Sequence, residues 1–295
     1  MFSERPRFSD AAAGALLLIA CYLVSAVSPL PVQAAESSGF TPMVINRVSP
    51  SRQLAMLKAV CDEGTLGIED GVPVCKVCPA FTSQTGEKNA SLRINNVIEG
   101  AFTRAGVAEA LIDLEGCEPH ANLYGGTVLL ERTDKGWKRG LYEPGFRADE
   151  CITFRTIELN QALACNTVDT AQGIQIGEIS WISLAGGEYQ ASSLLRWFDN
   201  IQSNPRRLVS VFPASFMKSD FNQDSRVDLS VLVRLRDAPV PAKYPGAIDA
   251  IASGHRFAEP ETVRLIYLFD GKQLSLSPQS KPGKAQIDKL LEQYL

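Results

Sequence analysis

Short apolar segments with alternating polar residues, each followed by a glycine-containing turn, constrain the fold of this chain most strongly. Two such segments joined by a short glycine turn are typical of a β-hairpin, whose strands run antiparallel. The clearest examples are residues 127–132 before Asp134-Lys135-Gly136, residues 178–184 before Gly186-Gly187, and residues 262–269 before Asp270-Gly271. The sequence therefore predicts a mainly β protein built from antiparallel hairpin units.

The hairpins group into about three units of similar pattern and of roughly 40 to 65 residues each, the size range of propeller blades. The strand and turn at 127–136 resemble those at 262–271, and Phe102 and Phe216 each precede an apolar strand. Because a closed propeller needs about four blades or more, we expect propeller-like units in an open or capped arrangement. The alternative is that hairpins resemble one another without sharing an architecture.

Two helices are expected outside the hairpins. Ser49-Pro50, followed by apolar residues at helical spacing, predicts a short N-terminal helix from about Pro50 to Cys61. Near the other end, apolar residues at helical spacing form one stripe that predicts a C-terminal helix. We therefore expect four parts, which are a signal peptide at 1–34, a helix plus cysteine-rich segment at 35–99, a β domain at 100–283 and a C-terminal helix at 284–295.

The N-terminal segment has the pattern of a secretory signal peptide. Two arginines precede an apolar run at 11–27, and small residues follow at Ala34 and Ala35. The run is shorter than the roughly 20 residues that span a bilayer, so we expect cleavage and a secreted or periplasmic protein. Two alternatives stay open: a membrane anchor through residues 11–27, and a lipid on Cys21, because Leu18-Ile19-Ala20-Cys21 resembles a lipobox.

Six of the seven cysteines lie after the signal segment, and an even number in an exported chain predicts up to three disulfides. These are Cys61, Cys75, Cys78, Cys117, Cys151 and Cys165. A redox pair at Cys75 and Cys78 is disfavoured because the βαβ context is missing, and zinc on Cys61, Cys75 and Cys78 would need a fourth ligand. All six lie in the first half of the mature chain that follows residue 34, so its second half needs another means of stabilisation.

The charge of the chain limits its partners. The formal net charge is -4, and removal of residues 1–34 leaves it unchanged because that segment holds two acidic and two basic residues. Binding to nucleic acid or to an anionic membrane surface is therefore not expected. The expected partner is a protein or a carbohydrate, for which three tryptophans could line a surface, although at hairpin positions they more often pack in the core.

Residues 220–228 carry the strongest functional signal. They place oxygen-bearing groups at alternate positions of a short loop, namely Asp220, Asn222, Asp224, the backbone carbonyl of Arg226, and Asp228. Calcium prefers six to eight hard oxygen ligands, and three converging carboxylates would repel one another without a cation. The loop therefore predicts a calcium site. It is not a standard EF-hand, because Val231 replaces the bidentate glutamate and a strand follows.

Residues 213–276, with this loop, the strand after it and the hairpin further on, resemble the FG-GAP and VCBS-type repeats of integrin-α-like propellers. The family has glycines at the fourth and sixth loop positions, where this chain has Gln223 and Ser225. A side chain in a left-handed backbone conformation costs on the order of 1 kcal/mol. The resemblance implies a calcium loop that steadies the sheet and performs no chemistry.

The sequence thus predicts an exported calcium-binding β-repeat protein with a structural or binding role. The alternative is a secreted hydrolase of unfamiliar type, using carboxylates of the first β unit such as Asp113, Glu115 and Glu118. The two histidines, His120 and His255, stand in no recognisable nucleophile or metalloprotease motif. A third hypothesis is an accessory to a surface assembly, which would make its contacts through uncovered sheet edges.

Overall fold

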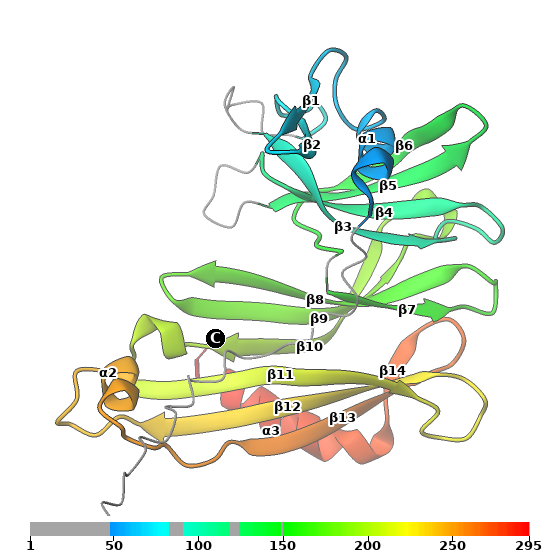
Figure 1. Ribbon diagram of the computed structural model, residues 1–295. Helices are drawn as coiled ribbons and strands as arrows, with labels where there is room; N and C mark the ends of the chain where they lie inside the picture. Colours follow the sequence, from blue (N-terminus) through cyan, green and yellow to red (C-terminus); the bar gives the residue numbers. More distant parts are fainter. Residues whose placement is uncertain (1–47, 83–90, 118–123, 149, 295) are drawn as a thin grey trace, which may run out of the picture. The chain divides into compact units, whose positions relative to one another are not determined.

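A computed structural model describes residues 48–82, 91–117, 124–148 and 150–294, all of which belong to one compact unit spanning residues 38–295. Antiparallel strands dominate this unit and form two sheets, and within each sheet every strand pairs with the next one along the chain (Figure 1). The shortest connections favour this order, because the two to five residues between β1 and β2, β5 and β6, β7 and β8, β8 and β9, and β13 and β14 let neighbouring strands pair only antiparallel. The predicted mainly β fold of antiparallel hairpins is confirmed.

The first sheet has six strands within the described residues, and helix α1 (Pro50–Leu57) packs on it. The strands are β1 (Leu66–Glu69), β2 (Val72–Cys75), β3 (Leu92–Gly100), β4 (Glu109–Glu115), β5 (Tyr124–Thr133) and β6 (Gly136–Glu143). Met56 and Leu57 of α1 are fully buried against Ile112 and Val128 of the sheet. The expected boundary between residues 99 and 100 falls within this sheet, because residues 93–100 of β3 pair with β4 on the far side of that boundary.

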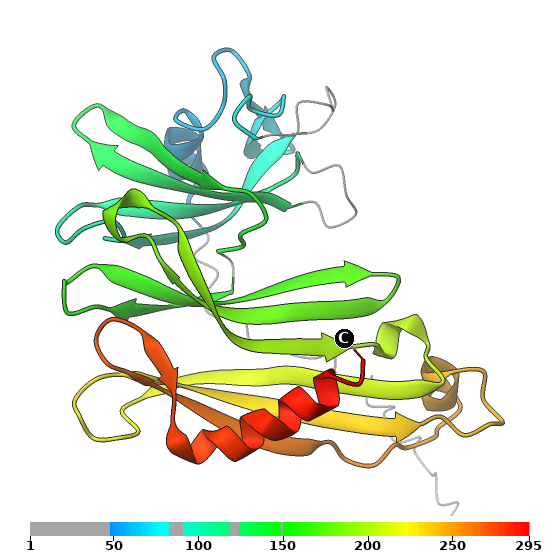
Figure 2. The same cartoon turned by 180° about the vertical axis from the view of Figure 1, so that it is seen from behind.

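The second sheet has eight strands within the described residues and curls as a half-barrel. The strands are β7 (Cys151–Arg155), β8 (Gln161–Ala171), β9 (Ile174–Ser183), β10 (Gln190–Asp199), β11 (Arg207–Ser219), β12 (Asp228–Pro239), β13 (Glu261–Phe269) and β14 (Leu274–Leu276). Helix α2 (Ala247–Ala252) lies between β12 and β13 in the chain. The C-terminal helix α3 (Lys281–Leu291) lies across β11 to β13 (Figure 2) and buries Ile287 and Leu291 in the core of the half-barrel.

The pairing of β11 changes along its length, and this change opens the half-barrel at one end. β11 pairs with β12 from Arg207 to Ser219, with a bulge near Pro213 that accommodates a residue without an N–H group. Its pairing with β10 covers only Ser210 and Val211 within the described residues. The far half of the β11–β12 hairpin therefore extends beyond β10, toward the side where β7 ends and β13 turns into β14 (Figure 1).

The two sheets meet through a shared apolar cluster. Leu111 and Leu129 of the first sheet pack with Leu163 and Ile182 of the second, and Phe102 is fully buried between them. The loop after β7 is fixed to the first sheet at the same place, because the side-chain N–H of Asn160 donates to the carbonyl of Phe102 at 3.1 Å. This bond holds the ends of β7 and β8 in position.

Three disulfides form, as the cysteine pattern predicts, and join Cys61 to Cys75, Cys78 to Cys117, and Cys151 to Cys165. All six cysteines are consumed, so Cys75 and Cys78 form neither a redox pair nor a zinc site with Cys61. Disulfides of this kind are typical of extracellular and periplasmic proteins. In the described part of the chain, no helix has the length and apolar character needed to cross a membrane. The expected signal peptide lies outside the described residues.

Candidate calcium-binding loop

The predicted calcium loop is the turn of the β11–β12 hairpin. β11 ends at Ser219 and β12 begins at Asp228, and these two residues are the last paired ones, so residues 220–227 form the connection. The start of β12 is anchored by buried residues such as Val231 and Val233, and β11 pairs with it although residues 215–219 of β11 are partly or fully exposed. Because the hairpin register is fixed by this burial, the loop has a fixed start and a fixed end.

Three of the predicted ligands turn into the loop and organise its backbone. The Asp220 carboxylate accepts the backbone N–H groups of Asp224 at 3.1 Å and of Ser225 at 2.9 Å. The side-chain oxygen of Asn222 also accepts the N–H of Asp224, at 3.1 Å. Asp224 in turn accepts the N–H of Arg226 at 2.8 Å. The oxygens of Asp220, Asn222 and Asp224 are therefore gathered around one short stretch of backbone.

The loop backbone is left-handed at the two positions where the FG-GAP and VCBS repeats have glycine. The φ angles are 63° at Gln223 and 69° at Ser225, which disfavour any residue with a Cβ atom. The hydrogen bonds from the neighbouring N–H groups to Asp220 offset part of this cost. The turn is thus adopted without the glycines that normally permit it.

Asp228 differs from the other predicted ligands because it is fully buried. One carboxylate oxygen accepts the N–H of Phe221 at 2.9 Å, and the other accepts the N–H of Phe269 at 2.8 Å. Phe221 belongs to the loop and Phe269 ends β13. Asp228 therefore ties the start of the loop to the neighbouring strand.

Electrostatics keep the exposed Asp224 carboxylate of the loop charged. The pKa of Asp224 lies below its ordinary value, mainly because its carboxylate accepts the N–H of Arg226. The guanidinium of Arg226 adds an ion pair, with 3.3 Å between Nη1 and an Asp224 oxygen. Asp224 is therefore ionised at neutral pH and available to a cation.

The donor set fits calcium in kind. A carboxylate has about four lone-pair sites, so Asp220, which accepts two N–H groups, keeps others for a metal. Asn222 and the Arg226 carbonyl add neutral oxygens, which hard cations accept. Among the described residues, no three His, Cys, Asp or Glu side chains come together as a metal-binding group. Any calcium would therefore be held largely by Asp220, Asn222, Asp224 and backbone or water oxygens.

The carboxylates of the alternative hydrolase hypothesis have structural partners. Asp113 is buried and accepts the side-chain N–H of Asn95 at 2.7 Å. Glu115 forms a two-pronged pair with Arg93 at 2.8 and 2.9 Å, which lowers the pKa of Glu115. Glu118 and His120 lie outside the described residues. His255 packs between the rings of Tyr244 and Phe257. The described residues of this hypothesis thus hold the fold together.

Of the three tryptophans considered for a binding surface, two are buried in the core and one is half-buried. Trp181 and Trp197 are buried in the core of the half-barrel, with Trp197 donating to Asn166 at 2.8 Å. Trp137 is half-buried at the β5–β6 turn, and Arg132 lies over its ring.

The sequence alone does not indicate the basic and apolar residues that gather at the open end of the half-barrel. Two of them, Arg155 and Lys218, lie 63 positions apart in the chain.

Comparisons with protein-family models, with curated proteins and with solved structures found no match for this chain. The resemblance to FG-GAP and VCBS-type repeats therefore rests on the loop and the strands around it.

Proposed function

We propose that this chain is an exported, disulfide-stabilised β protein whose loop 220–228 binds calcium, and that it has a structural or binding role without catalysis. The conformation of the loop supports this proposal most directly. Gln223 and Ser225 adopt the left-handed backbone that FG-GAP and VCBS loops assign to glycine, while the Asp220 carboxylate gathers the N–H groups beneath it. Residues held in strained backbone conformations cluster at functional and ligand-binding sites, so the strain at Gln223 and Ser225 supports a bound group here.

Calcium would act on the stability of the hairpin. The acids Asp220 and Asp224 repel each other in the exposed loop, and a divalent cation would remove that repulsion. Since Asp228 links the loop to β13, an ordered loop would also hold two neighbouring strands together. A ligand that binds only the folded state at 100 times its dissociation constant adds about 2.7 kcal/mol to the free energy of unfolding.

The test is thermal unfolding of the purified mature protein in calcium and in chelator. We expect the melting temperature to rise with calcium concentration, and magnesium to act more weakly because it requires a tighter octahedral shell. The double variant D220N/D224N should lose the shift. The matched control is D270N, because Asp270 accepts the N–H groups of Lys272 and Gln273 in another exposed turn. An unchanged melting temperature at millimolar calcium would remove the metal from the proposal.

The export part of the proposal has its own test. Mass spectrometry of the protein from an expressing cell should show a new N-terminus near Ala34 or Ala35 and no free thiols in the remainder. A lipid-modified Cys21 would instead indicate a membrane-anchored form. An intact N-terminus in the cytoplasm, with reduced cysteines, would contradict export.

A further inference from the structure

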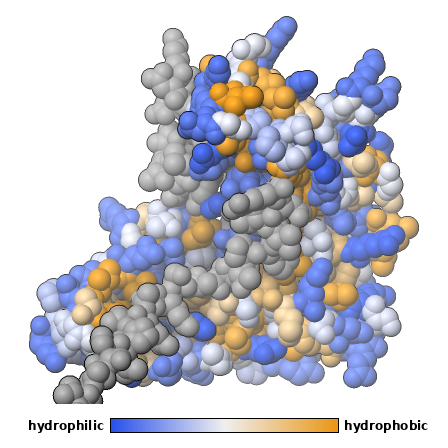
Figure 3. Space-filling view, viewed as in Figure 1, coloured by the Kyte–Doolittle hydropathy of each residue, from blue (hydrophilic) through white to orange (hydrophobic). Residues whose placement is uncertain are grey.

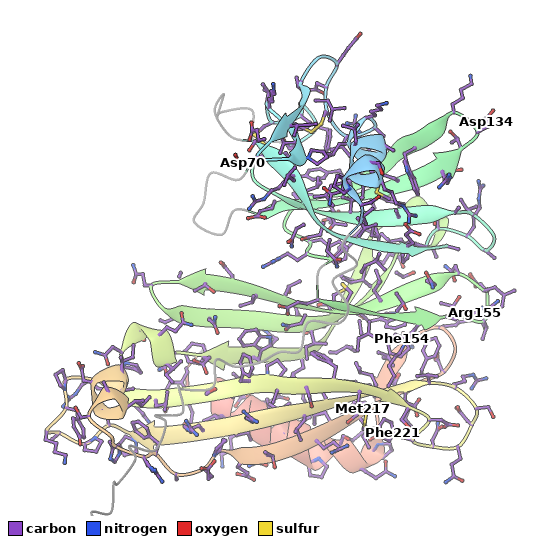
Figure 4. All side chains as sticks on the ribbon, viewed as in Figure 1. Asp70, Asp134, Phe154, Arg155, Met217 and Phe221 are labelled. Atoms are coloured by element: carbon purple, nitrogen blue, oxygen red, sulfur yellow. A yellow bond between two sulfur atoms is a disulfide. The ribbon has the colours of Figure 1, made fainter. Side chains whose placement is uncertain are left out.

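A cavity of about 470 Å³ lies at the open end of the half-barrel. Residues from the end of β7, the turn after it, the end of β11, the loop 225–227 and the β13–β14 turn line it. Figure 4 shows Phe154 and Arg155 on the side of the molecule where Phe221 and Met217 of the β11–β12 hairpin also lie. The volume is in the range of about 300–1,000 Å³ that small-molecule sites usually have.

Specific contacts between distant segments hold this cavity in place. The N–H of Ile157 donates to the carbonyl of Gly271 at 2.8 Å, which joins the turn after β7 to the β13–β14 turn. The ammonium group of Lys218 donates to the carbonyl of Thr153 at 3.0 Å, which joins β11 to β7. The first bond connects the two edges of the curled sheet and the second connects an interior strand to the β7 edge, so the protein itself positions these cavity walls.

Basic side chains surround the cavity, although the whole chain carries a net charge of -4. Arg155, Lys218 and Arg226 line it, and none of its described lining residues is Asp or Glu. Arg226 forms an ion pair with Asp224, with 3.3 Å between Nη1 and a carboxylate oxygen. Lys218 has the neutral Thr153 carbonyl as its hydrogen-bond partner, and Arg155 forms no ion pair within the described part of the chain. Two positive charges thus face the cavity without an acidic partner.

The same cavity has apolar walls and an apolar rim. Phe154 and Phe269 line its inner part, with ring centroids 5.5 Å apart. At the rim, Ile157 and Val227 are 55% and 44% exposed, which is unusual for large apolar side chains. Figure 3 shows hydrophobic residues beside strongly hydrophilic ones on this side of the molecule. Apolar walls with a few polar groups at the edge are the usual composition of a small-molecule site.

We infer that this cavity binds a small amphipathic anion, whose apolar body contacts Phe154, Phe269 and Ile157 and whose carboxylate or sulfonate group is held by Arg155 and Lys218. Arginine and lysine form charge-assisted hydrogen bonds to such groups, and these are stronger than neutral ones. The inference does not require calcium, because the bonds of Ile157 and Lys218 position the β7, β11 and β13–β14 sides of the cavity without a metal, and residues 225–227 form the remaining side.

The first experiment uses the wild-type protein in chelator, with the aryl sulfonate 1-anilinonaphthalene-8-sulfonate as a fluorescent probe. We expect saturable binding at one site, and displacement by octanoate at about a tenfold lower concentration than by octan-1-ol, because a charge-assisted bond is worth about that factor. Octylammonium should displace the probe least. Equal displacement by the three chains, or binding to anionic vesicles without octanoate binding, would overturn the inference.

The second experiment uses the double variant R155Q/K218Q, with R264Q as the matched control. Arg264 is an exposed arginine on β13 of the same sheet and does not line the cavity. We expect octanoate affinity to fall by at least about tenfold in the double variant and to stay unchanged in the control. Amide NMR shifts caused by octanoate in the wild type should centre on residues 153–157 and 225–227. Wild-type affinity in a folded double variant, or shifts centred elsewhere, would contradict the site.

Discussion

The buried carboxylate of Asp228 offers a demanding test of how the loop is attached to the sheet. Its two oxygens accept the N–H groups of Phe221 and Phe269, and the side chain has no exposure to solvent. In D228N, one oxygen becomes an NH₂ group that faces a backbone donor. One of these two N–H groups then loses its acceptor, and the new NH₂ group lacks an acceptor as well, each at about 1–3 kcal/mol.

The substitution also removes a buried charge, and the desolvation cost that is saved offsets part of the loss. We therefore expect D228N to lower the free energy of unfolding by about 2–4 kcal/mol. For a chain of this size, 1 kcal/mol changes the melting temperature by about 2–4 °C, which predicts a decrease of roughly 5–15 °C. Urea and thermal unfolding in chelator would measure the change without any contribution from metal. The exposed D224N variant serves as the control and should change stability by less than about 1 kcal/mol. A D228N protein within about 0.5 kcal/mol of the wild type would refute this account of the attachment.

Three further predictions address the turns and the core. The variant G271A should lower the melting temperature, because Gly271 has φ 96° and a Cβ there would lie 2.4 Å from Ile157, and the backbone strain alone costs about 1–2 kcal/mol. The variant S225G should relieve the left-handed strain of the loop, raise stability by up to about 1 kcal/mol in chelator and tighten calcium binding, as calorimetry would show. Burial raises the pKa of Tyr189 to about 12 and raises the pKa of Tyr267 as well. Since unfolded tyrosine ionises near pH 10, both residues contribute stability that is complete below pH 10 and is lost as the pH rises further, which urea unfolding at pH 9 to 11.5 would show.

The hairpins of this fold could be predicted because each depends on neighbouring residues. Strand alternation and a glycine turn lie within one short segment, as at Asp270-Gly271, and the helix start at Ser49-Pro50 is equally local. The number of disulfides was predictable from an even cysteine count, whereas their pairing was not. The eight strands from β7 through β14 form one curled sheet because neighbouring hairpins pair at their edges. The information that decides this pairing is not present in any single segment.

The same distinction between local and distant information applies to the two candidate sites. The ligands of the calcium loop are neighbours in sequence, so alternate oxygens at Asp220, Asn222 and Asp224 were visible before the fold was known. The role of Asp228 was not, because its partner Phe269 belongs to another strand. Arg155 and Lys218 line one cavity only because β11 leaves β10 after Val211 and Lys218 bonds to Thr153 of β7. A site formed by the curvature of a sheet can be recognised only when the strand register is known. The net charge of -4 describes the whole chain and does not exclude a local cluster of basic residues, so it is compatible with the proposed anion-binding cavity.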